Sequence, residues 1–278
     1  MFDLLLDGIH TNASPSLVTT GLQTIGGPGI LAVQYYDGYL DQLTILFDRA
    51  KSAEEILVDA TLVAHYSMDC LSYSALDSGP NQINGIAIGL SSGDGGRVGQ
   101  SVLFSSNASY FQATELVLLG QSYRSFSFAL WLRPITSVTT GGTILHVSQY
   151  NNGTGWCAQF IGLSSSGQIV AYVPGKIGAI QITGPVLTID QWVHVVLTYS
   201  KSNGLRLYIN GKVYGESARF IYAAADSVAM TVTLGQPLNG GSCDRGTIQS
   251  GHYRGEIDEF YIFSRELAKA DVQDLMNP

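Results

Sequence analysis

The sequence predicts an all-β protein whose main part is a sandwich of two antiparallel sheets. Only 13% of its 278 residues are charged, whereas it contains 32 glycines and 15 tyrosines. Valine, isoleucine, threonine and aromatic residues favour pleated strands, and glycine favours the turns that join them. Several segments also alternate apolar and polar residues, which is the period of a half-buried strand. A chain of this length can bury a core in one large or two smaller domains.

Three segments, 125–133, 191–199 and 205–209, show this alternation most clearly. The third ends at Asn210-Gly211, a pair that favours a two-residue hairpin turn. Residues of one strand face form a core ladder because successive side chains point to opposite faces. The residues expected to face the core are Phe126, Phe128, Leu130, Leu132, Val193, Val195, Leu197, Tyr199, Leu205, Leu207 and Ile209.

Two parts of the chain resemble each other. Segment 38–46 (GYLDQLTIL) is similar to segment 255–263 (GEIDEFYIF), and segment 4–8 (LLLDG) is similar to segment 207–211 (LYING). The second pair predicts a strand that enters an Asp-Gly or Asn-Gly hairpin turn. The two offsets, 255 − 38 = 217 and 211 − 8 = 203, differ by 14 residues, so the later copy is longer between the hairpin and the last strand.

This internal repeat predicts the domain organisation. After each copy of the last strand come an arginine and a stretch that is expected to form a short helix, at 49–56 and at 265–272. We therefore expect residues 1–57 to be the last strands and terminal helix of one domain, and residues 60–278 to be a complete second domain. Because a few strands cannot close a sandwich alone, we expect the chain to belong to a longer array of such domains.

The charge of the chain argues against two classes of partner. The formal net charge is −8, and Lys and Arg form no cluster. Nucleic acid and anionic membrane surfaces are therefore not expected as partners. No apolar run reaches the ~20 residues that a bilayer span requires, so no membrane span is expected in this chain. The N-terminal residues lack the cationic start and the apolar stretch of a signal peptide.

Three sequons for N-linked glycosylation lie in Ser- and Gly-rich stretches, at Asn12, Asn107 and Asn152. Pro15 follows the first and makes it less suitable, so Asn107 and Asn152 are the expected glycosylation sites. The alternative is chance occurrence in a Ser-rich sequence. Sequons in use imply an extracellular or cell-surface protein, whose signal peptide would lie outside this chain.

The chain has three cysteines, Cys70, Cys157 and Cys243, without the paired spacing of a zinc site. If the protein is secreted, Cys157 and Cys243 are the expected disulfide pair, which would close a long loop and restrict the unfolded chain. Cys70 would then be free or linked to another chain. The alternative is three buried free thiols.

Seven segments of the second domain occur in an order that carries a resemblance to a known family. They are 62–69 (LVAHYSMD), 77–85 (DSGPNQING), 99–104 (GQSVLF), 127–133 (SFALWLR), 192–199 (WVHVVLTY), 207–211 (LYING) and 255–260 (GEIDEF). Together they resemble the laminin-G-like jelly rolls of the concanavalin A-like lectin/glucanase superfamily. The resemblance covers residues 60–278 and implies a concanavalin A-like jelly-roll sandwich, preceded by a partial copy of the same fold.

The superfamily includes glucanases, which need a pair of carboxylates for hydrolysis. The matching pattern here is Glu256 with Asp258, which share a strand face. In the earlier copy only the aspartate recurs, as Asp41. Because catalysis needs both carboxylates, we do not expect an enzyme. His146 and His194 lie in alternating apolar strands and are interpreted as structural.

Relatives of this family often hold a structural calcium ion between the last strand and an early Asp-x-Ser-Gly loop. The resemblance therefore implies a calcium site with Asp77 and Asp258 as side-chain ligands and with carbonyl oxygens of segment 78–85. The alternative is that Asp258 caps a turn or accepts backbone N–H groups.

The function expected from these observations is that of a non-catalytic extracellular binding or adhesion module for carbohydrate or glycoprotein ligands, next to neighbouring domains of the same polypeptide. Sugar recognition needs exposed aromatic and polar groups in loops. Trp156 has a structural alternative, packing against a disulfide. A glycosidase-related domain and a structural spacer in a repeat protein are the alternative functions. The candidate ligand-binding residues are Tyr150, Trp156, Arg245 and Tyr253.

Overall fold

The computed structural model describes residues 4–6, 9–11, 50–69 and 75–277, and the chain divides into two compact units. The first unit is Met1–Thr61 and the second is Leu62–Pro278. The boundary therefore falls four residues after the expected end of the first domain at residue 57.

The described part of the first unit contains a hairpin and a helix. Strands β1 (Leu4–Leu6) and β2 (Ile9–Thr11) pair antiparallel, in line with the strand expected at the start of the chain, and the expected turn residues 7 and 8 lie outside the described residues. Segment 38–46, the expected last strand of the partial copy, lies outside the described residues. The partial copy therefore stays a prediction.

Helix α1 (Ala53–Thr61) begins later than the expected segment 49–56. The Ser52 hydroxyl accepts a hydrogen bond from the Glu55 N–H at 3.1 Å, and the Glu55 carboxylate accepts one from the Ser52 N–H at 2.7 Å. This reciprocal pair is a capping box, which satisfies N–H groups at the helix start. It fixes the start of the helix after Ser52.

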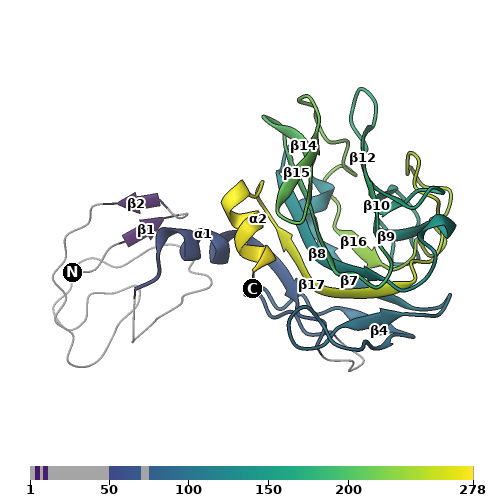
Figure 1. Ribbon diagram of the computed structural model, residues 1–278. Helices are drawn as coiled ribbons and strands as arrows, with labels where there is room; N and C mark the ends of the chain where they lie inside the picture. The colour runs from purple at the N-terminus through teal and green to yellow at the C-terminus, as the bar shows by residue number, and fades with distance from the viewer. Residues whose placement is uncertain (1–3, 7–8, 12–49, 70–74, 278) are drawn as a thin grey trace. The chain divides into compact units, whose positions relative to one another are not determined.

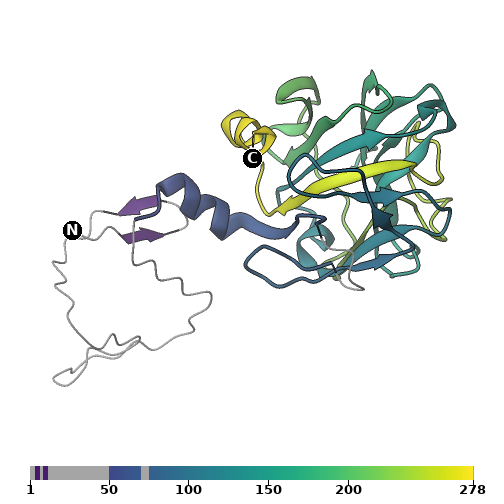
Figure 2. The same ribbon diagram turned by 60° about the horizontal axis from the view of Figure 1, so that its bottom comes forward.

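The second unit is a sandwich of two antiparallel sheets, as the sequence predicts (Figures 1 and 2). The seven-stranded sheet has the order β12 (Ile180–Val186), β11 (Gln168–Val173), β10 (Cys157–Leu163), β9 (Gly142–Ser148), β16 (Met230–Leu234), β7 (Tyr110–Leu116), β4 (Ile86–Ile88). The eight-stranded sheet has the order β15 (Lys212–Glu216), β14 (Gly204–Ile209), β13 (Val193–Ser200), β8 (Phe126–Pro134), β17 (Gly255–Phe263), β6 (Val102–Phe104), β5 (Ser91–Ser92), and β3 (Leu62–Tyr66) also pairs with β17. Short 3-10 turns span Val117–Gly120 and Val138–Thr140.

The three alternating segments of the sequence form adjacent strands β8, β13 and β14. Their expected core residues are buried, apart from the half-buried Ile209 at the end of β14. Asn210 and Gly211 have φ of 48° and 72°, the positive values that a type I′ hairpin turn requires. The period-2 pattern and the turn pair therefore predict this sheet correctly.

Aromatic rings fill the space between the sheets. Phe160 of the seven-stranded sheet lies 5.9 Å from the ring of Phe126 and 6.2 Å from that of Phe128, both of the eight-stranded sheet. The ring of Tyr222 contacts rings from both sheets, at 5.3 Å from Phe126 and 5.9 Å from Phe160. All four rings are fully buried. Burial of such large apolar surfaces is the main stabilising contribution in a sandwich.

The chain ends in helix α2 (Lys269–Met276), four residues later than the expected start at Arg265. Arg265 donates two hydrogen bonds to the carboxylate of Asp271, at 2.6 and 2.8 Å. The same carboxylate accepts the N–H of Ala268 at 2.6 Å, next to the first turn. Val272 is buried, so the helix is held by packing as well as by this cap. No helix in the described part of the chain is long and apolar enough to cross a membrane.

We expect Phe160→Ala to destabilise the second unit by about 3–5 kcal/mol, because it removes a fully buried ring from the contact between the sheets and leaves a cavity. Denaturant unfolding of the full chain measures this change. Ile177→Ala is the matched control, since Ile177 is fully exposed and its loss should change stability by less than about 0.5 kcal/mol. Equal effects of the two substitutions would contradict this assignment of the core.

Candidate functional site

A long connection between β16 and β17, here called loop 235–254, runs over the outer side of the seven-stranded sheet. Single bridges join it to that sheet's strands at Thr143–His252 and at Ala158–Asp244. The Gln159 N–H also donates to the Asp244 carbonyl at 2.8 Å. The loop lies in the stretch where the later copy is 14 residues longer than the earlier one.

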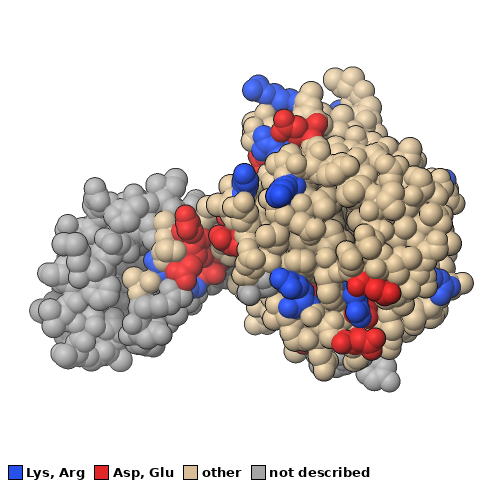
Figure 3. Space-filling model, viewed as in Figure 1, with Lys and Arg blue, Asp and Glu red and all other residues tan. Residues whose placement is uncertain are grey.

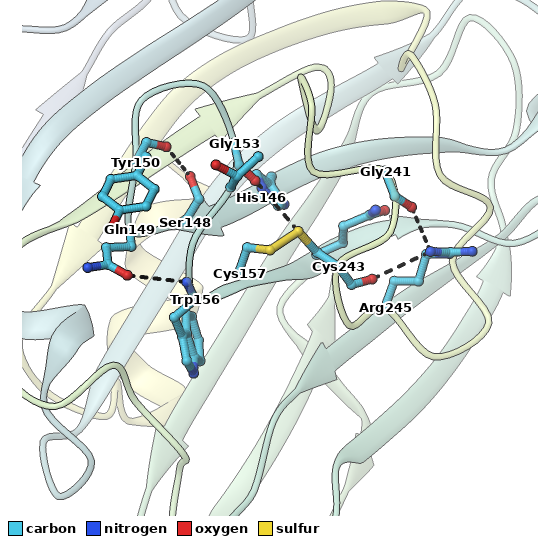
Figure 4. The surroundings of a disulfide bond; sticks show 12 residues. His146, Ser148, Gln149, Tyr150, Gly153, Trp156, Cys157, Gly241, Cys243 and Arg245 are labelled. Atoms are coloured by element: carbon cyan, nitrogen blue, oxygen red, sulfur yellow. Dashed lines mark hydrogen bonds between the residues drawn. A yellow bond between two sulfur atoms is a disulfide. The ribbon is translucent and has the colours of Figure 1, made fainter.

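A disulfide between Cys157 and Cys243 fastens loop 235–254 to the start of β10 (Figure 4). The two Cα atoms are 5.4 Å apart. This pairing agrees with the expectation from the sequence and excludes the alternative of free thiols for these two residues. Cys70 lies outside the described residues.

The disulfide lies over a buried histidine, His146. The His146 ring donates through Nε2 to the Gly153 carbonyl oxygen at 2.9 Å, and that oxygen lies 3.5 Å from the Cys243 sulfur (Figure 4). A Cβ added at Gly240 would lie 2.6 Å from His146 Nε2, so the chain packs closely there. Burial lowers the pKa of His146 to about 4. The imidazole is therefore neutral at physiological pH and acts as a structural group.

Loop 235–254 also contacts the connection between β9 and β10. The Asn239 N–H donates to the Asn152 carbonyl oxygen at 3.0 Å. A Cβ added at Gly153 would lie 2.3 Å from the Pro237 carbonyl oxygen, and the φ of Gly153 is 89°. Only glycine tolerates both conditions without strain. The two loops are thus held against each other by their backbones.

Between these loops and strands β4 and β7 lies a pocket of about 490 Å³. Among the described residues, no charged side chain lines it. Five of the lining residues are asparagine or glutamine, and one is tyrosine. The complete lining is Ile86, Tyr110, Gln112, Asn151, Asn152, Gln236, Leu238 and Asn239.

Hydrogen bonds hold two of the amide side chains of this pocket in place. Gln112 donates through Nε2 to the Asn151 carbonyl at 2.8 Å and to the Thr233 hydroxyl at 3.0 Å. Gln236 donates through Nε2 to the Ser109 carbonyl at 3.3 Å. Asn151 and Asn239 are exposed at the rim. The pocket therefore combines amides in fixed positions with amides open to solvent.

The backbone of the pocket wall is strained at Leu238, whose φ is 51°. A bulky residue rarely adopts a positive φ, and such residues cluster at binding and active sites. The turn is closed by the Gly240 N–H, which donates to the Pro237 carbonyl at 2.8 Å.

A second pocket, of about 500 Å³, lies beside β14, β15 and the start of α2. Three of its four charged lining residues are engaged with one another. Arg206 pairs with Glu216 at 3.3 Å and with Glu266 at 2.7 Å, and Glu266 also accepts hydrogen bonds from Ser200 and Asn203. This pocket offers a ligand fewer unengaged polar groups than the amide-lined one.

The four ligand-binding residues expected from the sequence have different surroundings. Tyr150 is 53% exposed and directly precedes the pocket residues Asn151 and Asn152, but is not itself part of the lining. Arg245 donates to the Gly241 carbonyl at 2.6 Å, within loop 235–254 (Figure 4). Neither residue lines the pocket.

The two other candidates are structural. Trp156 is half-buried and lies edge-on to Tyr222, with 5.8 Å between ring centroids, so it packs against the core, whereas packing against the disulfide stays a prediction. Tyr253 is only 1% exposed, and its hydroxyl donates to the Glu256 carbonyl at 3.3 Å. A ligand cannot reach this ring, so the choice of Tyr253 was wrong. The sequence around Tyr253 is typical of a loop, but its side chain points into the core.

Among the described residues, Asp77 and Asp258 share no hydrogen-bond donor. The Asp77 carboxylate accepts the N–H groups of His65 and Gly79 at 2.8 Å and that of Ile83 at 2.9 Å. Among the described residues, no three Asp, Glu, His or Cys side chains form a group that could hold a metal ion. These contacts give no support to a calcium ion shared by the two aspartates, and the site stays a prediction of the family resemblance.

Asp258 itself fastens the turn at residues 97–98 to β17. Its carboxylate accepts the N–H groups of Arg97 at 2.5 Å, Val98 at 3.1 Å and Glu259 at 3.0 Å. Burial raises the pKa of Asp258 to about 7, although the N–H groups of Val98 and Arg97 lower it. These contacts match the alternative role as an acceptor of backbone N–H groups.

Glu256, the other member of the acidic pattern, is 2% exposed. Its carboxylate pairs with Arg133 at 2.5 Å and accepts the Ser101 hydroxyl at 2.8 Å. A Cβ added at Gly93 would lie 2.7 Å from this carboxylate, so a turn covers it. Glu256 and Asp258 are therefore both covered and both engaged in hydrogen bonds.

The residues that line the amide-rich pocket were missed by the sequence analysis, apart from the sequon at Asn152. They come from four separate stretches of the chain between Ile86 and Asn239. No local spacing connects these stretches. The one available signal was the concentration of asparagine and glycine in segments 150–155 and 236–241.

Comparison with known proteins identifies the family. Residues 105–273, more than half of the chain, match the model of the laminin G family that is described as concanavalin A-like lectin/glucanases superfamily. The chain therefore belongs to this superfamily, in agreement with the resemblance seen in its sequence. No curated protein matches the sequence.

Solved structures share the fold at low sequence identity. The binding domain of Paraclostridial Mosquitocidal Protein 1 has a TM-score of 0.56 and 20% identity, over 79% of this chain and 52% of that one. The receptor binding domain of botulinum neurotoxin D has a TM-score of 0.53 and 15% identity, over 79% and 52%. The chain thus spans about half the length of these toxin domains.

A smaller domain is similar over nearly its whole length. Domain 4 of AbnA, an extracellular arabinanase from Geobacillus stearothermophilus solved with arabinotriose, has a TM-score of 0.50 and 20% identity, over 77% of this chain and 98% of that one. At these identities the likeness shows the shared fold.

We expect Cys157→Ala with Cys243→Ala to destabilise the second unit by about 2–4 kcal/mol, because the cross-link no longer restricts the unfolded chain. Hydrogen exchange should also accelerate at the Asn239 amide, which donates across the two pocket loops. Denaturant unfolding and exchange mass spectrometry measure the two effects. Unchanged exchange at Asn239 would contradict the role of the disulfide in holding the pocket wall.

Acidification should weaken the fold through His146. Its pKa in the folded state, about 4, lies below the ordinary value of 6.5, so the unfolded chain takes up a proton first. The resulting stabilisation is fully present above about pH 6.5 and is lost as the pH falls towards 4. Unfolding free energies measured from pH 7 to 4.5 should fall less steeply in His146→Gln, which does not titrate. Equal slopes in the two proteins would contradict this prediction.

Proposed function

We propose that the second unit is a non-catalytic binding module that takes a neutral carbohydrate in the amide-lined pocket. The observation that carries this proposal is the lining itself: five Asn or Gln side chains, one tyrosine and no charged group among the described residues. The location of the pocket, between a sheet face and two loops joined by their backbones, keeps its groups in fixed positions.

The chemistry of the lining fits hydroxyl groups. An amide side chain both donates and accepts hydrogen bonds, as a sugar hydroxyl does. The ring of Tyr110 offers a face against which the C–H groups of a sugar can pack. A charged ligand would find no opposite charge in this lining, and desolvation of its charge would be uncompensated.

The surface around the module is consistent with an uncharged ligand. Figure 3 shows wide areas without Lys, Arg, Asp or Glu on the face of the second unit that carries β9 and β10 in Figure 1. Electrostatic steering therefore contributes little on this side, and affinity has to come from hydrogen bonds and packing.

The structural neighbours support sugar binding at the level of the fold. The AbnA domain was solved with arabinotriose, a neutral sugar, whereas the cell entry of botulinum neurotoxin type C depends on two gangliosides, which are charged, so the first of these neighbours is the one that supports an uncharged ligand. The disulfide supports an extracellular setting, because such bonds persist in oxidising environments.

The state of the acidic residues supports a binding role rather than hydrolysis. A glycosidase needs two carboxylates that reach the scissile bond. Glu256 pairs with Arg133, and Asp258 holds the turn at residues 97–98, so neither carboxylate is open to a substrate.

We expect Tyr110→Ala and Asn239→Ala each to weaken binding of a neutral oligosaccharide about tenfold, which corresponds to the loss of about 1.4 kcal/mol of contacts. A glycan array identifies the ligand and calorimetry gives the affinities. Tyr123→Ala is the matched control, because Tyr123 is 62% exposed and does not line the pocket.

Two results would overturn the proposal. One is equal binding by Tyr110→Ala, Asn239→Ala and the unchanged protein. The other is a preference for sialylated or sulfated glycans whose affinity falls steeply with salt, because such binding depends on charges that the pocket lacks.

A further inference from the structure

We propose that Asn152 carries an N-linked glycan that closes the amide-lined pocket, so that glycosylation of this one residue controls access to it. This inference rests on the proposed function in one respect: the pocket has to be the sugar site for the glycan to regulate sugar binding. The presence and the position of the glycan can be tested separately.

The sequon and the pocket coincide at Asn152. This residue begins Asn152-Gly-Thr154, is exposed, and is one of the residues that line the pocket. Its carbonyl oxygen accepts the Asn239 N–H of the opposite wall at 3.0 Å. Asn152 therefore lies at a fixed place on the pocket rim, and so does anything attached to its side chain.

The side-chain amide of Asn152 is oriented by its own sequon. Its Oδ1 accepts the Thr154 N–H at 3.1 Å and the Thr154 hydroxyl at 2.7 Å. This is an Asx turn, in which the side chain mimics a backbone turn. The oxygen is thereby occupied, while Nδ2, the atom to which glycans are attached, has no hydrogen-bond partner among residues 50–69 and 75–277.

The second sequon, at Asn107, lacks this arrangement. Asn107 Oδ1 accepts Arg254 Nη2 at 2.8 Å, and the hydroxyl of Ser109 donates to the Ser106 carbonyl at 2.6 Å rather than to the asparagine. Ser109 is 1% exposed, and Asn107 is not a lining residue. Asn107 therefore supplies a control sequon in the same chain.

The modification requires a secretory compartment, and the Cys157–Cys243 disulfide indicates one. In the reaction, Nδ2 of Asn152 attacks C1 of an oligosaccharide carried on a polyprenyl diphosphate. The N–C1 bond forms, the C1–O bond to the diphosphate breaks, the diphosphate leaves with that electron pair, and a base of the transferase takes one Nδ2 proton. A bulky, solvated chain then stands at the rim of the pocket.

The effect on an external sugar follows from competition for the same space. If the attached glycan leaves the pocket open for only a fraction of the time, the apparent affinity falls to that fraction of the affinity of the open pocket. A chain whose pocket is open one-tenth of the time binds about tenfold more weakly. Removal of the sequon should restore the full affinity.

The test uses the full chain secreted from a eukaryotic host and two variants. Thr154→Val destroys the sequon but keeps Asn152 and the Asx-turn N–H, and Asn107→Gln removes the control sequon. Peptide mass spectrometry reports the glycan on Asn152. Calorimetry should show at least tenfold tighter sugar binding for Thr154→Val than for Asn107→Gln. The same proteins from a host without N-glycosylation should bind the sugar equally. This control separates the effect of the glycan from the effect of losing the Thr154 hydroxyl.

A second measurement does not depend on sugar binding. Nitration of Tyr110, which lines the pocket, should be slow in the glycosylated chain and fast in Thr154→Val. A chain without a glycan on Asn152, or equal nitration and equal affinity with and without it, would overturn the inference. A glycan-free chain that binds no sugar would refute the proposed function, whereas the nitration rates would still decide whether the glycan covers the pocket.

Discussion

The covalent link between Cys157 and Cys243 is the constraint on which the candidate site depends. The sandwich is held by continuous strand ladders and by rings buried between the sheets, whereas loop 235–254 meets its sheet through single bridges, separate backbone hydrogen bonds and the disulfide. A cross-link restricts such a long connection further, because it removes conformations from the unfolded and partly open states. The wall that contains Leu238 and Asn239 is therefore kept at one distance from the Asn152 loop.

Two acidic residues of the second unit show that backbone N–H groups can hold a carboxylate in place, as a metal ion can in other proteins. Asp77 and Asp258 each accept three N–H groups and so fix a turn beside a strand. A buried carboxylate needs such donors because its charge has lost water. A turn anchor of this kind needs one carboxylate and no acidic partner.

Much of the fold could be predicted from local patterns, whereas the pocket could not. The period-2 alternation identifies β8, β13 and β14 because one face of each lies against the core, and Asn210-Gly211 identifies the turn by its φ values. Helix limits shifted by several residues, because capping contacts such as that of Ser52 decide them. Tyr253 was misassigned because its neighbours are typical of a loop. The pocket combines strand, turn and loop residues that only the tertiary fold brings together.

The spacing difference between the two similar segments bears on where binding resides. The later copy is 14 residues longer between its hairpin and its last strand, and this is the stretch that contains Cys243 and the Leu238–Asn239 wall. A connection shorter by that length could still join the same strands, since the strand ladders do not require loop 235–254. A loop 235–254 shorter by that length could not reach the cysteine on β10 and also form the wall. The candidate pocket of the second unit therefore depends on a connection that the strand ladders themselves do not need.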